Sequence, residues 1–216
     1  MKNLDKLQKI AKENDIELDY LTDGSPIFQS KKLYTFTSDS VVLAQYVDET
    51  RIETLVDFCS GSGIVGFEVA GRIKVDRLVQ FELQEELARL AKLSAEYNES
   101  VSDIEVVNDS LENAIKYVQD VDVVVCNPPY FKKGSGRINE SSSKSLARHE
   151  LSITLEDIFI SASKILKRGG ALYFIHIIER EKEMSKLSKK YGFTEIKKEV
   201  LLGNKLVRFL VKFIKN

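Results

Sequence analysis

The sequence has little of several features that mark particular classes of protein. Two cysteines, two histidines and three prolines occur among 216 residues, and there is no internal repeat, low-complexity tract or Pro/Gly-rich linker. No apolar run approaches the roughly 20 residues that cross a bilayer, and the first residues lack a secretory signal core. Cys59 and Cys126 each end an apolar run, which suits a reducing compartment. We therefore expect a cytoplasmic protein with no membrane segment and no metal site.

An excess of positive charge is also missing. The chain carries 32 basic and 33 acidic residues and a formal net charge of −1. A protein that coats nucleic acid generally would be more basic, so any contact with phosphates must come from a local patch. Lys132, Lys133 and Arg137 are the candidates for such a patch, because they follow the most informative motif of the chain.

Apolar strands alternate with helices through the centre of the chain. Strands are expected at 54–58, 77–81, 104–107, 121–126 and 171–178, with helices at 64–72, 84–98, 111–118, 155–166 and 181–191. Such apolar strands, separated by helices, indicate a parallel sheet covered on both faces. Residues 193–202 and 205–214 flank Gly203-Asn204 and predict a terminal β-hairpin. The fold class is therefore α/β, with a mixed seven-stranded sheet that ends in antiparallel strands.

The first 50 residues are predicted to pack on this core as part of a single domain, with residues 51–216 forming the core itself. Apolar spacing predicts a helix over about 4–14. Residues 19–36 are expected to be irregular or a hairpin, with Gly24-Ser25-Pro26 as the turn. A second helix is expected to begin at Thr37 and to continue to about Val47.

A glycine loop follows the first core strand. Asp57-Phe-Cys-Ser-Gly61-Ser-Gly63-Ile-Val-Gly66 contains the Gly-x-Gly-x-x-Gly pattern, in which the missing Cβ atoms let the backbone approach a ligand. Glu82 ends the next strand, where an acid typically binds a ribose hydroxyl. On these residues alone, a nicotinamide enzyme and a methyltransferase are both open.

Two further acids favour S-adenosylmethionine over a dinucleotide. Asp57 precedes the glycines, where it would repel a pyrophosphate but accept hydrogen bonds from an ammonium group or a water. Asp109-Ser110 follows the third strand, at the edge where open α/β sheets bind ligands. Asp57, Glu82 and Asp109 thus offer three acceptors to a cationic nucleoside that bears amines.

The motif Asn127-Pro128-Pro129-Tyr130 directly follows a buried strand. The two prolines restrict the backbone and present the Asn127 side chain and the Pro128 carbonyl to a ligand. Two such acceptors can bind both hydrogens of an exocyclic adenine amine and aim its lone pair at a methyl group. Tyr130 can stack on the base, a contact worth roughly 1–3 kcal/mol. The motif therefore predicts methyl transfer to a planar amine.

Together these motifs resemble the Rossmann-type methyltransferases with an Asn-Pro-Pro-Tyr signature, and within them the tRNA1(Val) adenine-37 N6-methyltransferases. The stretch from Phe36 to Ala44, the element Ala147-Arg148-His149-Glu150 and the turn Lys167-Arg-Gly-Gly170 also match that family. The resemblance implies S-adenosylmethionine as cofactor and the anticodon loop of a tRNA as partner. We expect a monomer or a weak dimer.

The resemblance also implies the roles of individual residues. The target base would meet Asn127, Pro128, Pro129 and Tyr130. The cofactor would be bound by Thr37, Asp39, Asp57, Ser60, Gly61, Gly63, Glu82, Leu83, Asp109, Ser110 and Asn127. Independently of the resemblance, local charge makes Lys132, Lys133 and Arg137 candidates for RNA contacts, together with Arg148 and His149 of the matching element. The polar segment 132–144 is expected to cover the site as a lid. His176, inside the fifth strand, is expected to be structural.

Other functions remain open at this point. A protein glutamine side chain poses the same nucleophile problem, but the enzymes that methylate it carry a longer helical region than the 56 residues that precede Asp57 here. An rRNA guanine N2 acceptor would more typically accompany Phe or Trp in place of Tyr130. A non-catalytic RNA-binding module or a nicotinamide oxidoreductase would not explain Asp57, Asp109 and Asn127 together.

Overall fold

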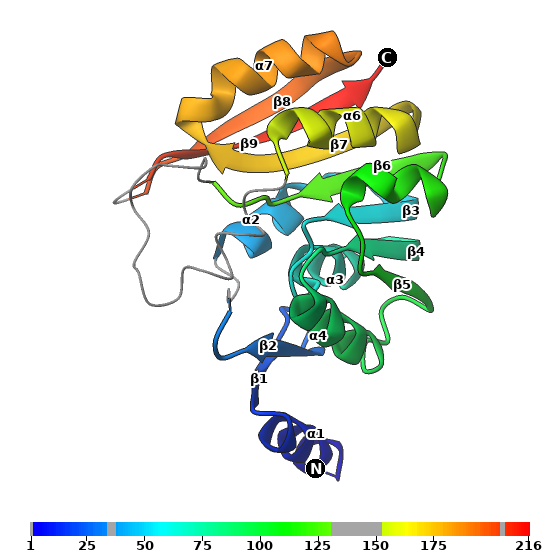
Figure 1. The fold of residues 1–216 in the computed structure, drawn as a ribbon, viewed down its shortest axis with the longest axis vertical. Helices are drawn as coiled ribbons and strands as arrows, with labels where there is room; N and C mark the ends of the chain where they lie inside the picture. The colour runs from blue at the N-terminus through cyan, green and yellow to red at the C-terminus, as the bar shows by residue number, and fades with distance from the viewer. Residues whose placement is uncertain (1, 34–37, 131–152, 204–205) are drawn as a thin grey trace.

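A seven-stranded sheet forms the centre of the computed structural model, which describes residues 2–33, 38–130, 153–203 and 206–216. The strand order is β5-β4-β3-β6-β7-β9-β8 (Figure 1). Strands β3 to β7 pair in parallel, and β9 pairs antiparallel with both β7 and β8. The strands are β3 (Arg51–Phe58), β4 (Lys74–Phe81), β5 (Asp103–Val107), β6 (Val121–Cys126), β7 (Leu166–Ile177), β8 (Phe193–Leu201) and β9 (Arg208–Lys215). This order confirms the predicted mixed sheet with a C-terminal hairpin.

Helices cover both faces of the sheet. One apolar cluster joins the sheet to α2 and α3, and a second joins its other face to the 3-10 helix η1 and to α6 and α7. The helices are α1 (Lys2–Glu13), α2 (Ser38–Tyr46), α3 (Ile64–Ala70), α4 (Glu85–Ala95), η1 (Leu111–Lys116), α6 (Leu155–Ile165), η2 (Ile178–Arg180) and α7 (Glu181–Lys190). A sheet buried on two faces explains why its strands read as continuous apolar runs.

Strand β6 shows this double burial directly. Successive side chains of a strand point to opposite faces, and Val124 joins the cluster beneath η1 and α6, whereas Val123 and Val125 join the one beneath α2 and α3. All three side chains are at most 2% exposed. Because β6 is buried on both faces, its end is held firmly within the core. The residues that follow Cys126 therefore start from a fixed position.

The N-terminal elements pack against α4. Strands β1 (Ile16–Tyr20) and β2 (Pro26–Ser30) form a separate antiparallel hairpin, and α1 lies at the opposite end of the molecule from α7 (Figure 1). A third apolar cluster joins α1 and the hairpin to Leu87 and Leu90 of α4. The amide of Phe28 also donates to the Ser94 hydroxyl of α4 over 3.0 Å. These contacts connect the first elements of the chain to the helix that follows Glu82.

Strand β7 differs from the prediction at its start. It begins at Leu166 rather than Ala171, so the predicted turn Lys167–Gly170 lies within the strand, where the pairing with β6 shifts register. Gly169 has a φ of 77°, and a Cβ on Gly170 would come within 2.9 Å of the Val121 carbonyl oxygen. The two glycines let the chain bulge against β6 while the pairing continues, as in a β-bulge.

Smaller differences concern element type and length. Residues 111–116 form a 3-10 helix, in which the Ser110 hydroxyl accepts from the Glu112 amide. Strand β1 starts at Ile16, before the region predicted to be a hairpin. The terminal hairpin pairs Leu201 with Arg208, so its connection is longer than the predicted Gly203-Asn204 turn. Helix α2 is described from Ser38, and Thr37 lies outside the described residues.

Candidate active site

The candidate site lies where four parallel strands end. Strands β3, β4, β5 and β6 lead into the glycine loop, Glu82, Asp109 and Asn127 respectively. The chain passes from β3 to β4 on one side, and β6 lies on the other side of β3. Open α/β sheets bind ligands at such a reversal of strand order. The fold therefore brings the predicted cofactor and base residues to one edge of the sheet.

The glycine loop turns sharply between β3 and α3. Cys59, Gly61 and Gly63 have φ values of 57°, 58° and 93°, a region that residues with a Cβ rarely adopt. The Ser60 amide donates to the Phe81 carbonyl over 3.1 Å, and the Gly63 amide donates to the Ser60 carbonyl over 2.8 Å. The backbone thus closes on itself before α3 begins, as a ligand-binding loop requires.

Gln80 binds the glycine loop from the end of β4, and no sequence motif indicated this role. Its side chain is fully buried, and its Nε2 donates to the Gly63 carbonyl over 3.0 Å. A Cβ on Gly63 would lie 2.5 Å from the Phe67 ring and 2.8 Å from the Gln80 amide. The only sequence signal for this residue is a polar side chain among the apolar residues that end β4.

Asp57 is completely buried beneath the same loop. Its Oδ2 accepts from the Gly66 amide over 2.9 Å, and its Oδ1 has no hydrogen-bond partner among the residues that the structure describes. Burial raises the pKa of Asp57 to about 8, and the nearby Glu82 charge acts in the same direction. A buried acceptor without a partner is costly, and a cationic or hydrogen-bonding ligand at the loop would relieve that cost.

The Glu82 carboxylate binds backbone amides of the glycine loop and of the start of α4. One carboxylate oxygen accepts from the Gly61 amide and the other from the Gln84 amide, each over 2.8 Å. The Asn108 amide group donates to the carbonyls of Glu82 and Leu83 over 2.9 and 3.1 Å. These bonds join the ends of β3, β4 and β5, and Asn108 is a second residue that the sequence analysis did not single out.

Asp109 makes local hydrogen bonds. Its carboxylate accepts from the Asn113 amide group and from the Tyr117 hydroxyl, each over 2.9 Å, and from the Ser110 amide. The Asn113 hydrogen bond is the main cause that lowers the pKa of Asp109. The carboxylate is therefore ionised at neutral pH, and a charged acceptor makes a stronger hydrogen bond than a neutral one.

The Asn-Pro-Pro-Tyr motif follows β6 and contacts the start of α2. The Asn127 Nδ2 donates to the Ser40 hydroxyl over 3.0 Å. The Tyr130 hydroxyl lies 2.8 Å from Asp39 Oδ2 and 3.4 Å from Asn127 Oδ1. Pro128 is buried and Pro129 is exposed. These two bonds join residues that lie 87 and 91 positions apart in the sequence. The motif and the stretch around Asp39 are thus parts of one site.

Arg208 completes this group from the C-terminal hairpin. It forms an ion pair with Asp39, whose side chain is only 7% exposed. Behind Tyr130 lies His176, with the ring centroids 5.2 Å apart. Burial lowers the pKa of His176 to about 4, and its Nδ1 accepts from the Ile177 amide. The expectation that His176 is a buried structural residue agrees with its 2% exposure.

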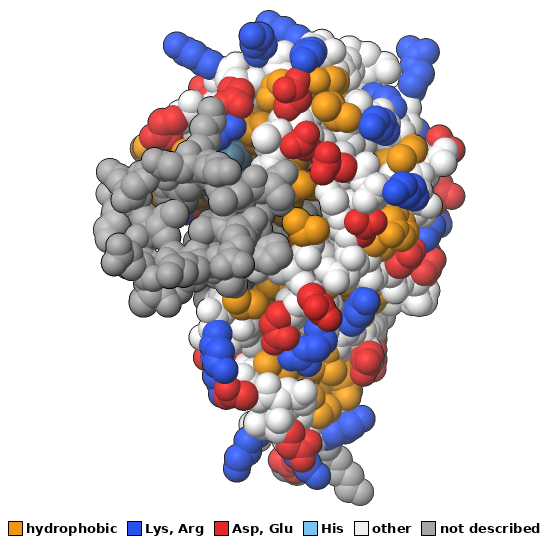
Figure 2. Space-filling model, viewed as in Figure 1, with side chains coloured by type: hydrophobic (Ala, Val, Ile, Leu, Met, Phe, Trp, Pro, Cys, Tyr) orange, Lys and Arg blue, Asp and Glu red, His pale blue; other side chains and the backbone are white. Residues whose placement is uncertain are grey.

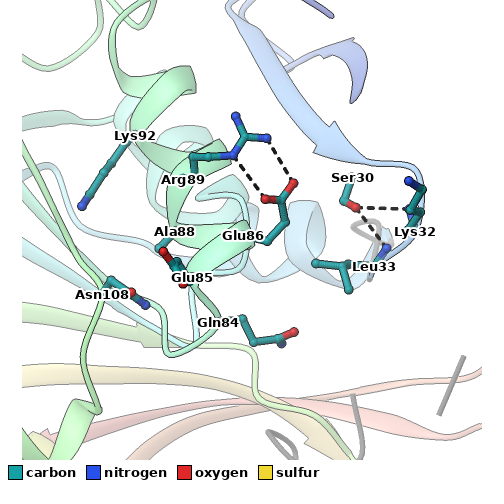
Figure 3. Close-up of a pocket in the computed structure, with 10 residues that line it drawn as sticks. All are labelled: Ser30, Lys32, Leu33, Gln84, Glu85, Glu86, Ala88, Arg89, Lys92 and Asn108. Carbon is teal, nitrogen blue, oxygen red and sulfur yellow. Dashed lines mark hydrogen bonds and ion pairs between the residues drawn. The ribbon is translucent and has the colours of Figure 1, made fainter. Parts of the chain in front are cut away.

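A groove of about 790 Å³ runs beside the first turns of α4. In Figure 3, Glu86 and Arg89 lie between Ser30, Lys32 and Leu33 on one side and Lys92 and Asn108 on the other. The remaining lining residues are Gln84, Glu85 and Ala88. Because Gln84 and Asn108 also bind Glu82, the groove adjoins the ribose-binding end of the predicted cofactor site and not the Asn127 end.

The structure does not test every predicted site residue. Thr37, Lys132, Lys133, Arg137, Arg148 and His149 lie outside the described residues, as does the predicted lid at 132–144. Within the described ranges, no group of three or more His, Cys, Asp or Glu side chains is arranged to bind a metal. No described helix has the length and apolarity of a membrane span.

The fold and the glycine loop define a Rossmann-like methyltransferase. Counted from the first core strand, the sheet order is 3-2-1-4-5-7-6, with one antiparallel strand inserted before the edge. The family described as methyltransferase small domain matches residues 27–200. The chain belongs to this family.

Several known proteins are similar to the chain. A tRNA1(Val) (adenine(37)-N6)-methyltransferase of Shewanella baltica is 29% identical over 120 residues, which are 54% of this chain and 49% of that protein. A protein of the same name from Cytophaga hutchinsonii is 25% identical over 195 residues, 87% of this chain and 79% of that one. The matched part of the chain thus spans about half the length of the Shewanella relative.

Solved structures agree on the fold. TrmN from Thermus thermophilus superimposes with a TM-score of 0.60 at 19% identity, over 82% of this chain and 48% of that chain. The M. jannaschii tRNA m1G37 methyltransferase gives a TM-score of 0.66 at 13% identity, over 93% of this chain and 57% of that chain. Both likenesses support the Rossmann-like methyltransferase fold.

Proposed function

We propose that this protein transfers a methyl group from S-adenosylmethionine to the exocyclic N6 of an adenine in tRNA, at position 37 of a valine tRNA. The observation that carries the proposal is the contact of the Asn127 amide with Ser40 and Tyr130. The names of the Shewanella and Cytophaga relatives support the choice of acceptor. A tRNA substrate would also place the reaction in the cytoplasm.

The residues at the sheet edge suit S-adenosylmethionine. Asp57 Oδ1 and Ser60 Oγ are buried polar atoms without a partner in the described part of the chain. A Cβ on Gly61 would meet no atom within 4 Å, so the loop leaves space on that side. Glu82 and Asp109 are expected to bind the ribose and the adenine of the cofactor. When bound, S-adenosylmethionine supplies an electrophilic methyl group on a sulfonium.

Asn127 is suited to bind an amine that acts as a nucleophile. The Tyr130 hydroxyl has one proton to donate, and its oxygen lies 2.8 Å from Asp39 but 3.4 Å from Asn127 Oδ1. The shorter contact takes the proton, which leaves Oδ1 able to accept from N6. With the Pro128 carbonyl as second acceptor, both N6 hydrogens are bound.

These two acceptors would stabilise the transition state selectively. The N6 lone pair is delocalised into the adenine ring, and binding both hydrogens favours the pyramidal nitrogen that can attack. Positive charge would grow on N6 as its bond to the methyl formed and the methyl–sulfur bond broke to leave a neutral thioether, so the hydrogen bonds to Oδ1 and to the carbonyl would strengthen. One N6 proton then leaves to solvent, and positioning supplies much of the rate enhancement.

The proposal is tested by incubating the protein with labelled S-adenosylmethionine and total tRNA and digesting the product to nucleosides. Wild type should yield N6-methyladenosine. Asn127→Ala should lower kcat by roughly 100-fold or more, because one acceptor that acts in the transition state is lost. Tyr130→Ala should raise KM for tRNA about tenfold or more through lost stacking.

Matched controls separate chemistry from folding. Asn14→Ala changes an exposed asparagine that caps the end of α1, and it should leave the yield of N6-methyladenosine unchanged. Circular dichroism should show that Asn127→Ala is folded. Methylation of a release-factor peptide and not of tRNA would contradict the proposal, as would labelled 2-methylguanosine from rRNA.

A further inference from the structure

The C-terminal hairpin contributes a charged residue to the candidate active site. Arg208 is the first residue of β9 and pairs in register with Ile177 of β7 and Leu201 of β8. Its guanidinium nevertheless binds Asp39, which lies 169 positions earlier in the first turn of α2. The side chain of Arg208 is 23% exposed and that of Asp39 is 7% exposed. The hairpin is thus connected to the site by a largely buried ion pair.

Asp39 uses its two oxygens for two different partners. Oδ1 accepts from Arg208 Nη1, and Oδ2 accepts from the Tyr130 hydroxyl over 2.8 Å. A buried carboxylate is costly unless it is paired and hydrogen-bonded. Arg208 provides the opposite charge beside this largely buried carboxylate, and Asp39 Oδ2 accepts the hydrogen bond of the phenol.

The contacts from Arg208 through Asp39 hold the phenol ring of Tyr130 in place. The Tyr130 hydroxyl is bound at one end, and its ring lies against His176 with a centroid distance of 5.2 Å and an interplanar angle of 48°. Ser40, the neighbour of Asp39 in the same helical turn, binds the Asn127 amide. One turn of α2 therefore orients both the stacking residue and the residue that accepts from the amine.

We propose that Arg208 is a positioning residue, which acts through Asp39 to hold Tyr130 in place for the target base and to keep the Asn127 oxygen available to N6. This inference rests on the proposed function for the identity of the base. The effect of Arg208 on the position of Tyr130 does not depend on which planar group accepts the methyl. The C-terminal hairpin then serves substrate binding, whereas the glycine loop on the other side of β6 serves the cofactor.

The first test needs no substrate. In protein labelled with ¹³C-tyrosine, the ring signals of Tyr130 are assigned by their loss in Tyr130→Phe. Arg208→Met should shift and broaden these signals, and Arg208→Lys, which keeps the charge, should shift them less. Arg51→Met is the matched control, because Arg51 forms a surface ion pair with Asp76. Unchanged Tyr130 signals in a folded Arg208→Met protein would overturn the inference whatever the acceptor is.

The second test is a double-mutant cycle on tRNA methylation. Arg208→Met should lower kcat/KM for tRNA roughly ten- to a hundredfold, which is the scale of a displaced positioning group. In the Tyr130→Phe background the same substitution should lower it less than about threefold, since the hydroxyl that Arg208 controls is gone. Arg208→Lys should restore most of the loss.

Affinity for S-adenosylhomocysteine separates positioning of the base from support of the cofactor. The resemblance assigned Asp39 to the cofactor, but both of its carboxylate oxygens bind Arg208 and Tyr130 instead. Calorimetry should therefore give a Kd for Arg208→Met within about threefold of wild type. If Arg208→Met weakened cofactor and tRNA binding equally, the inference would be overturned. Fully additive effects of Arg208→Met and Tyr130→Phe on kcat/KM would overturn it as well. If wild type methylates another planar amine, the proposed function fails, but shifted Tyr130 signals together with a non-additive cycle on that acceptor would still support the role of Arg208.

Discussion

At the residue scale, the charge state of Asp57 is set by its surroundings. The carboxyl group is fully buried, accepts one backbone hydrogen bond and lies near the charge of Glu82. Burial penalises the ionised form, so Asp57 remains largely protonated at neutral pH. A bound ammonium group would reverse this preference because it favours the carboxylate.

This environment predicts how stability depends on pH. The pKa of Asp57 is about 8 in the folded protein, against an ordinary value of 3.8 for an aspartic acid, so the folded state holds the proton more tightly. The tighter binding of the proton therefore adds fully to the free energy of unfolding below about pH 4. This contribution is lost as pH rises from about 4 through about 8. Relative to Asp57→Asn, wild type should lose unfolding free energy between about pH 5 and pH 9, as measured by urea denaturation.

The asparagine variant is a matched control because it keeps the size of the side chain and cannot ionise. Both proteins share every other titrating group, so subtracting their pH profiles isolates Asp57. A difference that stays constant from acid to alkaline pH would contradict the assignment of a raised pKa.

At the element scale, the glycine loop depends on two glycines for different reasons. Gly61 has a positive φ but open space around its Cβ position, whereas Gly63 has a positive φ and a Cβ position in contact with Phe67 and Gln80. Alanine at Gly61 should therefore meet only backbone strain of about 1 kcal/mol. Alanine at Gly63 should also meet overpacking, which typically costs about 1–3 kcal/mol more.

The prediction is that Gly63→Ala lowers the free energy of unfolding by about 2–4 kcal/mol and Gly61→Ala by about 1 kcal/mol. Urea denaturation of the two variants measures both values. Equal losses would show that Gln80 and Phe67 move aside at no cost and do not hold the loop.

Most of the elements could be predicted from the sequence, because apolar runs and turn residues act locally. The parallel strands, the glycine loop and the terminal hairpin were predicted correctly. The start of β7 was not, because the turn at Lys167–Gly170 lies inside the strand, which already pairs with β6 at Leu166. Whether a glycine pair ends a strand or bends it depends on the neighbouring strand, which the local sequence does not contain.

Within the candidate site, residues in motifs could be predicted and residues that act over long range could not. Asp57, Glu82 and Asn127 have recognisable spacing and lie together at the sheet edge. Gln80 and Arg208 belong to no motif, and their contacts depend on strand neighbours and on a helix far away in sequence. A polar residue among apolar strand residues is the one signal that could have found Gln80.

At the scale of the whole molecule, charge is balanced and mixed. Basic and acidic side chains are interspersed over the face shown in Figure 2, in keeping with the net charge of −1. Under the proposed function, binding of tRNA through phosphates would then come from a few local cations. The candidates from the sequence are Lys132, Lys133 and Arg137, whose role stays a prediction.

The affinity for tRNA should accordingly fall as salt rises, with a modest slope set by a few phosphate contacts. Replacing Lys132 and Lys133 by alanine should reduce that slope by roughly one to two units on a log–log plot. Lys9→Ala, at an exposed position on α1, should not change it. Filter binding at several salt concentrations measures the slopes, and equal slopes for all three proteins would contradict the patch.

The most direct test of the central claim is the identity and position of the methylated nucleotide. Unmodified valine tRNA is incubated with the protein and S-adenosylmethionine, cleaved with a guanosine-specific nuclease and analysed by mass spectrometry. We expect one methyl group on the fragment that contains adenine 37, and N6-methyladenosine after full digestion. Methyl on guanine, on ring N1 of adenine, or on a protein glutamine in a parallel reaction would contradict it.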